Sequence, residues 1–255
     1  MKRSVMLSLA GILVLSLLLS ACGGGATEKV RVATDATWPP FEFVDETTKE
    51  TTGFDIELMK AIAEKGGFEI EFVNVSWDPL LAGMAQCQYD ASISAMTITE
   101  ERKAQFNFSD PYFAAGQVVS VRADNTDITG KDGLAGKTIG AQLGTTGDIE
   151  GQAIAAAQGA VLKNYDDIGL AFQDLMNGQI DAVIADNPLA LGYIGQNPDK
   201  LKTAGQVFTD EFYGIAVCKT NTELLAKINK GLAAVKQEGL IEQLTTKWIS
   251  SAGGG

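Results

Sequence analysis

Apolar residues recur along the chain with two different periods. In segment 68–75 apolar residues alternate with glutamates, which predicts a strand with one buried face. In segment 53–65 Phe54, Leu58 and Ile62 stand four positions apart, which predicts a helix that buries one side. Segments of these two kinds follow one another from about residue 29 onward, so we expect strands and helices to alternate.

The predicted elements form two successive runs with the same alternation. Strands are predicted at 29–34, 68–75, 90–96, 117–122, 137–142, 160–164, 180–185, 201–204 and 212–218. Helices are predicted at 53–65, 79–86, 99–104, 146–157, 166–177, 222–236 and 240–248. A further helix is expected to begin near Pro188, because proline suits the first turn of a helix.

Alternating strands and helices imply mostly parallel sheets that helices cover on both faces. The predicted fold class is therefore α/β, with two doubly wound lobes joined by a hinge of two segments. The chain crosses between the lobes near 111–117 and 207–212, and neither segment has the Gly and Ser content of a free linker. This division gives one discontinuous lobe from 29–113 and 212–250, and a second lobe from 117–207.

The first residues have the features of a bacterial export signal. Lys2 and Arg3 precede an apolar run at 5–19, which is short for a membrane span of about 20 residues. We therefore expect residues 1–21 to be a signal peptide and the mature protein to be exported.

The string Leu-Ser-Ala-Cys that ends at Cys22 resembles the lipobox of bacterial lipoproteins, in which the cysteine thiol receives a diacylglycerol. An ordinary signal peptide followed by an incidental cysteine is the alternative. With a lipid on Cys22, the glycine-rich segment 22–28 would be a flexible tether at the outer face of the cell membrane. Residues 251–255 are expected to be a disordered tail.

Composition excludes several classes of function. The chain has 20 Lys and Arg against 32 Asp and Glu, and without Lys2 and Arg3 the net charge of −12 becomes −14. A nucleic-acid-binding protein would have a basic balance instead. Histidine is absent, which removes the commonest general base and metal ligand. Beyond Cys22 only two cysteines remain, too few for a structural zinc site, so we expect no metal and no cofactor.

Polar and aromatic residues follow the predicted strands, where ligands bind in open α/β sheets. They are Asp35, Trp38, Trp77, Ala95, Thr97, Arg102, Thr146 and Asp186. A free amino acid needs a clamp for its carboxylate and acceptors for its ammonium group. Arg102 and the backbone N–H of Thr146 at a helix start suit the carboxylate. Asp186, Thr97 and the carbonyl group of Ala95 suit the ammonium group.

Each of these residues also has a purely structural interpretation. Thr99 and Thr146 could be helix N-caps, and Asp35 and Asp186 could cap turns. Arg102 could be a surface cation, and the two tryptophans could be core residues. Their joint placement after strands of both halves favours a site.

Several strings strengthen this interpretation. They are Val32-Ala33-Thr34-Asp35, Pro39-Pro40-Phe41-Glu42-Phe43, Gly53-Phe54-Asp55-Ile56, Thr97-Ile98-Thr99-Glu100-Glu101-Arg102, Phe108-Ser109-Asp110-Pro111-Tyr112 and Gly144-Thr145-Thr146. From about Val30 to Trp248 the chain resembles the polar amino acid-binding proteins of bacterial ABC importers, solute-binding family three. The resemblance implies two lobes that close on a ligand, as in type II periplasmic binding proteins.

The resemblance also implies roles for individual residues. Arg102 takes the family's carboxylate-binding position, Asp186 its ammonium-binding position, and Trp38 and Trp77 its aromatic walls. Asp35 matches the acid that meets the distal end of the ligand. At two further positions, Ala95 stands where relatives often have Ser or Gly, and Gln142 stands where the residue varies with the ligand.

The leading hypothesis is an amino acid-binding subunit that delivers its ligand to a membrane permease and catalyses nothing. We expect a monomer that touches the membrane only through its lipid. The expected ligand is a basic amino acid, arginine before lysine, because flat aromatic walls suit a guanidinium group and Asp35 its charge. Glutamine is the alternative ligand. An enzyme that resembles cyclohexadienyl or arogenate dehydratases is the alternative function, and a sensor's receptor domain is a third.

The cysteines Cys87 and Cys218 form a candidate disulfide bond. In this architecture the strand predicted at 212–218 should run antiparallel beside the strand at 90–96, which brings the two cysteines together. An exported protein can form such a bond. Two unpaired buried cysteines are the alternative.

Overall fold

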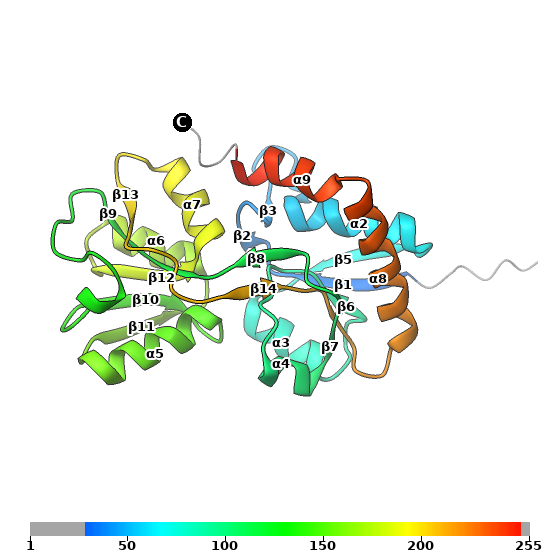
Figure 1. The fold of residues 1–255 in the computed structure, drawn as a ribbon, viewed down its shortest axis with the longest axis horizontal. Helices are drawn as coiled ribbons and strands as arrows, with labels where there is room; N and C mark the ends of the chain where they lie inside the picture. Colours follow the sequence, from blue (N-terminus) through cyan, green and yellow to red (C-terminus); the bar gives the residue numbers. More distant parts are fainter. Residues whose placement is uncertain (1–28, 251–255) are drawn as a thin grey trace, which may run out of the picture.

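The computed structural model describes residues 29–250. The expected signal peptide, the lipid-anchor residue Cys22, the tether and the tail at 251–255 lie outside this part of the chain. Two five-stranded sheets stand side by side, each with helices on both faces, and two strands connect them (Figure 1). The fold is therefore a two-lobed α/β fold.

The first lobe is built on a sheet with the order β5-β1-β6-β15-β7. Its strands are β1 (Val30–Thr34), β5 (Ile70–Asn74), β6 (Ala91–Ser92), β7 (Asn107–Phe108) and β15 (Ala216–Val217). Its helices are α2 (Phe54–Gly66), α3 (Trp77–Ala85), α4 (Glu100–Gln105), α8 (Thr222–Gln237) and α9 (Leu240–Leu244), which continues as a π-helical turn over Thr245–Ser250. Helices α2 and α8 cover one face, and α3 and α4 cover the other (Figure 1).

The second lobe is built on a sheet with the order β11-β10-β12-β9-β13. Its strands are β9 (Gln117–Arg122), β10 (Thr138–Gln142), β11 (Val161–Tyr165), β12 (Ala182–Asp186) and β13 (Leu201–Ala204). Its helices are α5 (Thr146–Gln158), α6 (Ile168–Met176) and α7 (Asn187–Gln196), with a 3-10 turn at Lys131–Gly133. Helix α5 lies on one face, and α6 and α7 lie on the other (Figure 1).

Two short antiparallel strands, β8 (Phe113–Ala115) and β14 (Glu211–Tyr213), run side by side between the lobes (Figure 1). The prediction of one strand at 212–218 is wrong. The chain instead leaves β14 and enters the sheet of the first lobe as β15. Gly214 lies between these strands, where a Cβ atom would be 2.8 Å from the side chain of Ile98. The predicted limits of the two lobes stay a prediction.

The strand predicted at 90–96 is also shorter than expected. Only Ala91–Ser92 pairs as β6, and Ala95 has a φ of 42° that turns the chain out of the extended conformation. The short strands β2 (Thr37–Trp38), β3 (Glu42–Val44) and β4 (Thr51–Thr52), which form a sheet of their own, were not predicted. Strands of two or three residues are too short to show a period of hydrophobic positions.

An aromatic cluster joins the segments that meet at the hinge. The ring of Phe41 contacts Phe54, Phe113 and Tyr213 edge-on, with centroid distances of 5.2–5.5 Å. These rings come from α2, from both hinge strands and from the turn before β3. Gly53 is required beside them, because its φ is 128° and a Cβ atom would lie 2.2 Å from the carbonyl oxygen of Phe41.

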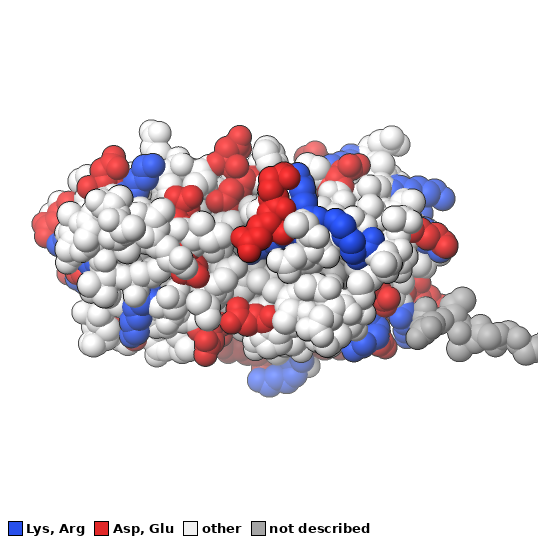
Figure 2. All heavy atoms as spheres, turned by 90° about the horizontal axis from the view of Figure 1, so that it is seen from below, with Lys and Arg blue, Asp and Glu red and all other residues white. Residues whose placement is uncertain are grey.

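The charges on the surface are mixed. Figure 2 shows one face, on which acidic side chains are spread over both lobes with basic side chains among them. This face has no continuous basic stripe of the kind that binds nucleic acid. Within residues 29–250 no helix has both the length and the apolar character needed to cross a bilayer.

Cys87 and Cys218 are joined by a disulfide bond in the structure, with their Cα atoms 5.1 Å apart. Strand β15 runs antiparallel to β6, with Val217 opposite Ala91. The backbone N–H of Cys218 donates to the carbonyl oxygen of Asp90 at 3.0 Å. The bond therefore fastens the returning strand to the loop between α3 and β6.

We predict that removing this bond destabilises the protein without changing the fold. The bond closes a loop of 131 residues, and a loop of this length should contribute about 2–5 kcal/mol to the free energy of unfolding. Urea unfolding of wild type with and without reductant measures this contribution, and a Cys87→Ala, Cys218→Ala double variant should not respond to the reductant. Two thiols that react with an alkylating reagent in the unreduced folded protein would contradict the bond.

Candidate functional site

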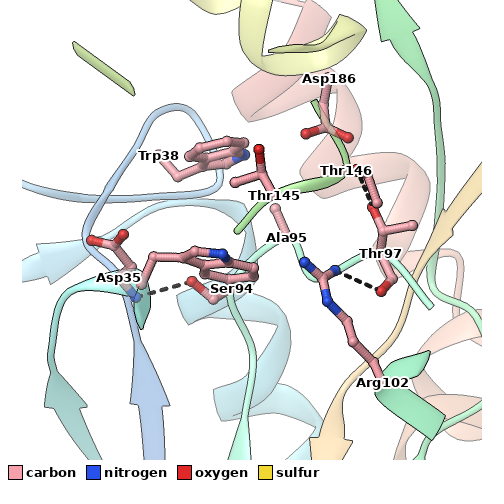
Figure 3. Close-up of a pocket in the computed structure, with 10 residues that line it drawn as sticks. Asp35, Trp38, Ser94, Ala95, Thr97, Arg102, Thr145, Thr146 and Asp186 are labelled. Carbon is pink, nitrogen blue, oxygen red and sulfur yellow. Dashed lines mark hydrogen bonds between the residues drawn. The ribbon is translucent and has the colours of Figure 1, made fainter. Parts of the chain in front are cut away.

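One pocket lies between the lobes and gathers most of the residues that the sequence singled out (Figure 3). Its lining consists of Asp35, Trp38, Trp77, Ser94, Ala95, Thr97, Arg102, Thr145, Thr146 and Asp186. Of the nine candidate ligand-binding residues, only Gln142 is not part of this lining, and it hydrogen-bonds to Asp35. Strand ends and helix starts of both lobes supply these residues.

Arg102 lies on α4 with its guanidinium group turned inward. The side chain of Thr99 caps this helix by accepting the backbone N–H of Arg102 at 3.1 Å. The residue is 8% exposed, and its guanidinium group donates to the carbonyl oxygens of Thr97 and Gly144 at 2.9 and 3.1 Å. Burial lowers the pKa of Arg102 to about 10, so the group is still charged at neutral pH.

No carboxylate of the described chain forms an ion pair with Arg102, although exposed ion pairs occur elsewhere on these residues. Its guanidinium group also lies over the ring of Trp77, 5.1 Å from the centroid. Only carbonyl oxygens and an aromatic ring contact this buried cation. It can therefore still bind an anion. Arg102 is therefore not a surface cation, which was the alternative interpretation.

Asp186 ends β12 directly before α7. It is 3% exposed, and its side chain makes no capping hydrogen bond to that helix. One of its oxygens accepts the side-chain N–H of Gln117 at 3.1 Å. Burial, followed by the nearby charge of Glu211, raises the pKa of Asp186 to about 7. The carboxyl group is thus withdrawn from water, without a capping role in the helix that follows.

Asp35 directly follows β1 and lies on the far side of the pocket from Asp186 and Arg102 (Figure 3). Its carboxylate accepts hydrogen bonds from Thr37 at 3.0 Å and from the amide N–H of Gln142 at 3.2 Å. Burial raises its pKa to about 6, against the effect of these hydrogen bonds.

Gln142 determines which hydrogen-bonding groups are free beside Asp35. Its amide nitrogen donates to Asp35 and, at 3.1 Å, to the carbonyl oxygen of Asp166. Its amide oxygen is buried and has no hydrogen-bond partner. Asp35 and this amide oxygen are both acceptors, which suit a ligand end that carries several N–H groups.

Ala95 presents its backbone to the pocket in a conformation that few residues other than glycine adopt. Its φ is 42°, and its backbone N–H donates to the carboxylate of Asp55 at 2.7 Å. The same carboxylate oxygen accepts the hydroxyl of Tyr112 at 2.7 Å. Asp55 therefore holds the turn that carries Ala95.

Glu42 and Asp55 form a buried acid pair beneath the pocket. Ser94 donates to Glu42 at 3.0 Å and accepts the backbone N–H of Asp35 at 2.9 Å. Burial and the neighbouring Asp55 raise the pKa of Glu42 well above its usual range. These two acids were not identified from the sequence, although both stand in the strings that carry the resemblance.

Thr145 and Thr146 have different roles at the start of α5. Thr145 is the N-cap, and its hydroxyl accepts the backbone N–H of Asp148 at 3.2 Å. Thr146 is the first residue of the helix, so its own N–H has no partner within the helix. The cap interpretation therefore holds for Thr99 but not for Thr146, because the cap of α5 is the preceding residue, Thr145.

Trp38 and Trp77 belong both to the pocket and to the core. They are 7% and 6% exposed, and each is part of a hydrophobic cluster. Their indole N–H groups are buried and without a partner. Figure 3 shows the ring of Trp38 between Asp35 and Asp186.

Sequence reasoning missed Ser94, Thr145, Gln117 and Glu211. Ser94 and Thr145 stand next to residues that were named. Gln117 and Glu211 fall in the predicted hinge segments, which were given no side-chain role. Among residues 29–250 no group of three or more potential metal ligands gathers.

Comparison with protein families gives a match that spans residues 30–251. The matching model is that of the bacterial extracellular solute-binding proteins, family 3. The chain belongs to this family. Proteins of this family that match it include the ABC transporter arginine-binding protein 1 of Escherichia coli strain K12, which is 38% identical and covers 93% of this chain and 98% of its own. The L-cystine-binding protein TcyJ of the same strain is 33% identical and covers 86% of this chain and 82% of its own.

Solved structures resemble this solute-binding protein over most of their length. An ancestral arginine-binding protein bound to arginine is 45% identical, with a TM-score of 0.82, over 86% of this chain and 97% of that one. An ancestral arginine-binding protein bound to glutamine is also 45% identical, with a TM-score of 0.80 and the same coverage. The family thus includes proteins named for different amino acids.

The raised pKa values of the pocket acids predict how stability depends on pH. The unfolded chain has released the protons of Asp35 and Asp186 at pH 5, while the folded protein, with pKa values of about 6 and about 7, keeps them. Raising the pH from 5 to 8 should therefore lower the free energy of unfolding of the ligand-free protein, at about 1.4 kcal/mol per pKa unit. Urea unfolding at several pH values measures this slope.

Asp186→Asn should make the slope smaller, because the variant lacks one of the groups that lose a proton. Asp174→Asn is the control, since a hydrogen bond from Lys163 lowers the pKa of Asp174 and places its titration below this range. An unchanged slope in Asp186→Asn would contradict a protonated Asp186 in the folded protein at pH 5.

Proposed function

We propose that this solute-binding protein captures a basic amino acid outside the cytoplasm, arginine in preference to lysine, and delivers it to an ABC permease. The observation that carries the proposal is the set of charged groups around one pocket. Asp35 stands on one side, and Asp186 and Arg102 stand on the other (Figure 3). An amino acid with a cationic side chain carries the complementary set, two positive groups and one negative group.

The main-chain end of the ligand would lie beside Arg102 and Asp186. The guanidinium fork of Arg102 suits a carboxylate, and the unpartnered N–H of Thr146 adds a donor at a helix N-terminus. The carboxylate of Asp186, the hydroxyl of Thr97 and the carbonyl oxygen of Ala95 are acceptors for the ammonium group. Every polar group of a free amino acid then has a partner of opposite character.

The side chain of the ligand would lie toward Asp35 between the rings of Trp38 and Trp77. A guanidinium group stacks on aromatic rings and has five N–H donors. Asp35 and the unpartnered amide oxygen of Gln142 can accept several of them. A lysine ammonium group has only three donors and no planar face, so arginine fits this end better.

Glutamine is the alternative ligand, and the structure of an ancestral relative with bound glutamine supports weighing it. A neutral side chain would leave the buried Asp35 either charged without a cation or protonated. Because both states are less favourable than a paired charge, we place glutamine after the basic amino acids.

We propose no catalytic step. The acids that line the pocket, Asp35 and Asp186, both have binding roles in this arrangement, so neither is left over as a general acid for a dehydratase. We also propose that the protein acts as a monomer and that a lipid on Cys22 holds it at the outer face of the cell membrane. The related proteins named as parts of ABC transporters support a permease as its partner.

Arg102→Ala should abolish amino acid binding while the protein stays folded. Loss of the paired charge of a buried ligand carboxylate should cost about 2–5 kcal/mol of binding free energy. Titration calorimetry with L-arginine measures the change. Lys103→Ala is the matched control, because Lys103 lies on the same helix, is exposed and pairs only with Glu100. Near-normal affinity in Arg102→Ala would refute the assigned role.

Asp35→Asn should separate arginine from glutamine. Removing this charge should weaken arginine binding by about tenfold or more, since hydrogen bonds to charged groups contribute about 1.5–3 kcal/mol. Glutamine binding should change far less. Asp124→Asn removes the same charge from an exposed site and should leave both affinities unchanged. Wild-type protein that binds glutamine tightly and ignores arginine would overturn the ligand assignment.

A further inference from the structure

A buried carboxylate on the hinge lies directly behind the pocket. Glu211, the first residue of β14, is 9% exposed and is not part of the pocket lining. It has no role in the ligand contacts proposed above. It is nevertheless the acceptor at the centre of a hydrogen-bond network that includes two residues of the pocket.

Both oxygens of Glu211 are occupied by donors of the protein. Oε2 accepts the hydroxyls of Thr97 at 2.9 Å and Thr146 at 2.8 Å, and the amide N–H of Gln117 at 3.3 Å. Oε1 accepts the hydroxyl of Thr209 at 2.7 Å. Oε2, the oxygen near the pocket hydroxyls, already has three donors, and Glu211 does not line the pocket. Glu211 therefore acts on a ligand only through its partners.

The carboxylate of Glu211 orients the two pocket hydroxyls. A hydroxyl has a single proton and two lone pairs, and an ionised carboxylate can only accept. The hydroxyls of Thr97 and Thr146 lie 3.5 Å from each other but 2.9 and 2.8 Å from Glu211, so the shorter contacts direct both protons to the carboxylate. The side-chain NH2 group of Gln117 shares its two protons among Glu211, the hydroxyl oxygen of Thr146 at 3.0 Å and Asp186 at 3.1 Å. Each hydroxyl oxygen therefore has only lone pairs left to offer a ligand.

The amide of Gln117 is oriented by the same charges. Its nitrogen lies within 3.3 Å of oxygens of Asp186 and Glu211. The opposite orientation would place its oxygen against two carboxyl groups. Gln117 itself is fully buried, and its backbone N–H donates to Thr209 at 2.7 Å, so the whole network is fixed from the hinge.

We propose that Glu211 is a positioning residue that makes the hydroxyls of Thr97 and Thr146 acceptors beside Asp186, and so selects ligands with an α-ammonium group. An ammonium group donates three hydrogen bonds, for which Asp186, Thr97, Thr146 and the carbonyl group of Ala95 are available. An α-hydroxyl group donates one and brings two lone pairs against lone pairs. Sites of this kind reject analogues whose polar groups cannot pair.

The position of Glu211 also explains why one residue reaches both hydroxyls. Thr97 belongs to the segment after β6 and forms an isolated antiparallel bridge with Tyr213, two residues from Glu211. Thr146 begins α5 in the other lobe. Since β14 runs between the lobes, a single carboxylate there can accept a hydroxyl from each side.

The test compares two ligands that differ in the α-group alone, L-arginine and its 2-hydroxy analogue, by titration calorimetry. Wild type should prefer L-arginine. In Glu211→Gln the new amide N–H donates, so the proton of one threonine can turn into the pocket. Affinity for L-arginine should fall by about tenfold or more, the affinity for the 2-hydroxy analogue should fall less, and the ratio of the two should shrink by about tenfold.

Two further variants isolate the effect. Asp210→Asn removes the same charge from the exposed neighbouring residue, and it should keep the wild-type ratio. Thr97→Val keeps the shape of the side chain and removes one acceptor, so it should shrink the ratio as Glu211→Gln does. This variant also provides the test should Glu211→Gln not fold.

This inference rests on the proposed function, and the outcomes separate the two. Wild type that binds neither L-arginine nor L-glutamine overturns the proposed function and this inference with it. Wild type that binds L-glutamine instead is tested with L-glutamine and its 2-hydroxy analogue. Equal losses for the amino acid and the hydroxy analogue in Glu211→Gln, or an unchanged ratio in Thr97→Val, overturn the inference alone.

Discussion

The arrangement in which the two lobes close around the pocket removes three charged groups from water without ion pairs between them. Arg102, Asp35 and Asp186 are each less than one-tenth exposed, and none forms an ion pair with another described residue. Desolvation costs several kcal/mol per ion, and the acidic groups near Arg102 offset only part of this cost, because the pKa of Arg102 is still lowered. Burial is also the main cause of the raised pKa values of the two acids and of the lowered pKa of the guanidinium group. A ligand with the complementary charges would remove this cost, and it would thereby favour the closed state.

The hinge supports this pocket with two different kinds of contact on one strand. Side chains of β14 alternate, so that Glu211 and Tyr213 are buried while Phe212 is 45% exposed. Tyr213 packs edge-on against Phe41 at 5.3 Å, in the aromatic cluster that joins the hinge to α2. Glu211 binds hydroxyls of both lobes. The apolar contact fixes the position of β14. Because Glu211 is on the same strand, this contact also fixes the position of the polar network.

Much of this fold follows from local patterns in the sequence, and the parts that do not follow share a cause. Strands β9 and β13 have the predicted limits, and α2 and α8 lie within one residue of theirs, because their apolar residues are periodic. Pocket residues were found because strand ends of a parallel sheet meet at one edge. Glu211 was missed since it lies 114 residues from Thr97 and 65 from Thr146, and no periodicity records such a contact. The acid pair of Glu42 and Asp55 was also missed, because its contacts likewise leave no periodic pattern in the sequence.

The residues that would hold the ligand also make hydrogen bonds between the lobes, and the two tasks are compatible. Arg102 gives one N–H to Thr97 of its own lobe and one to Gly144 of the other. A guanidinium group has five N–H donors, so three are left for a carboxylate. Asp35 accepts Thr37 from its own lobe and Gln142 from the other, and a carboxylate has further lone pairs. A ligand would therefore add its hydrogen bonds to those between the lobes instead of replacing them. Hydrogen bonds to the ligand and hydrogen bonds between the lobes would then favour the same conformation.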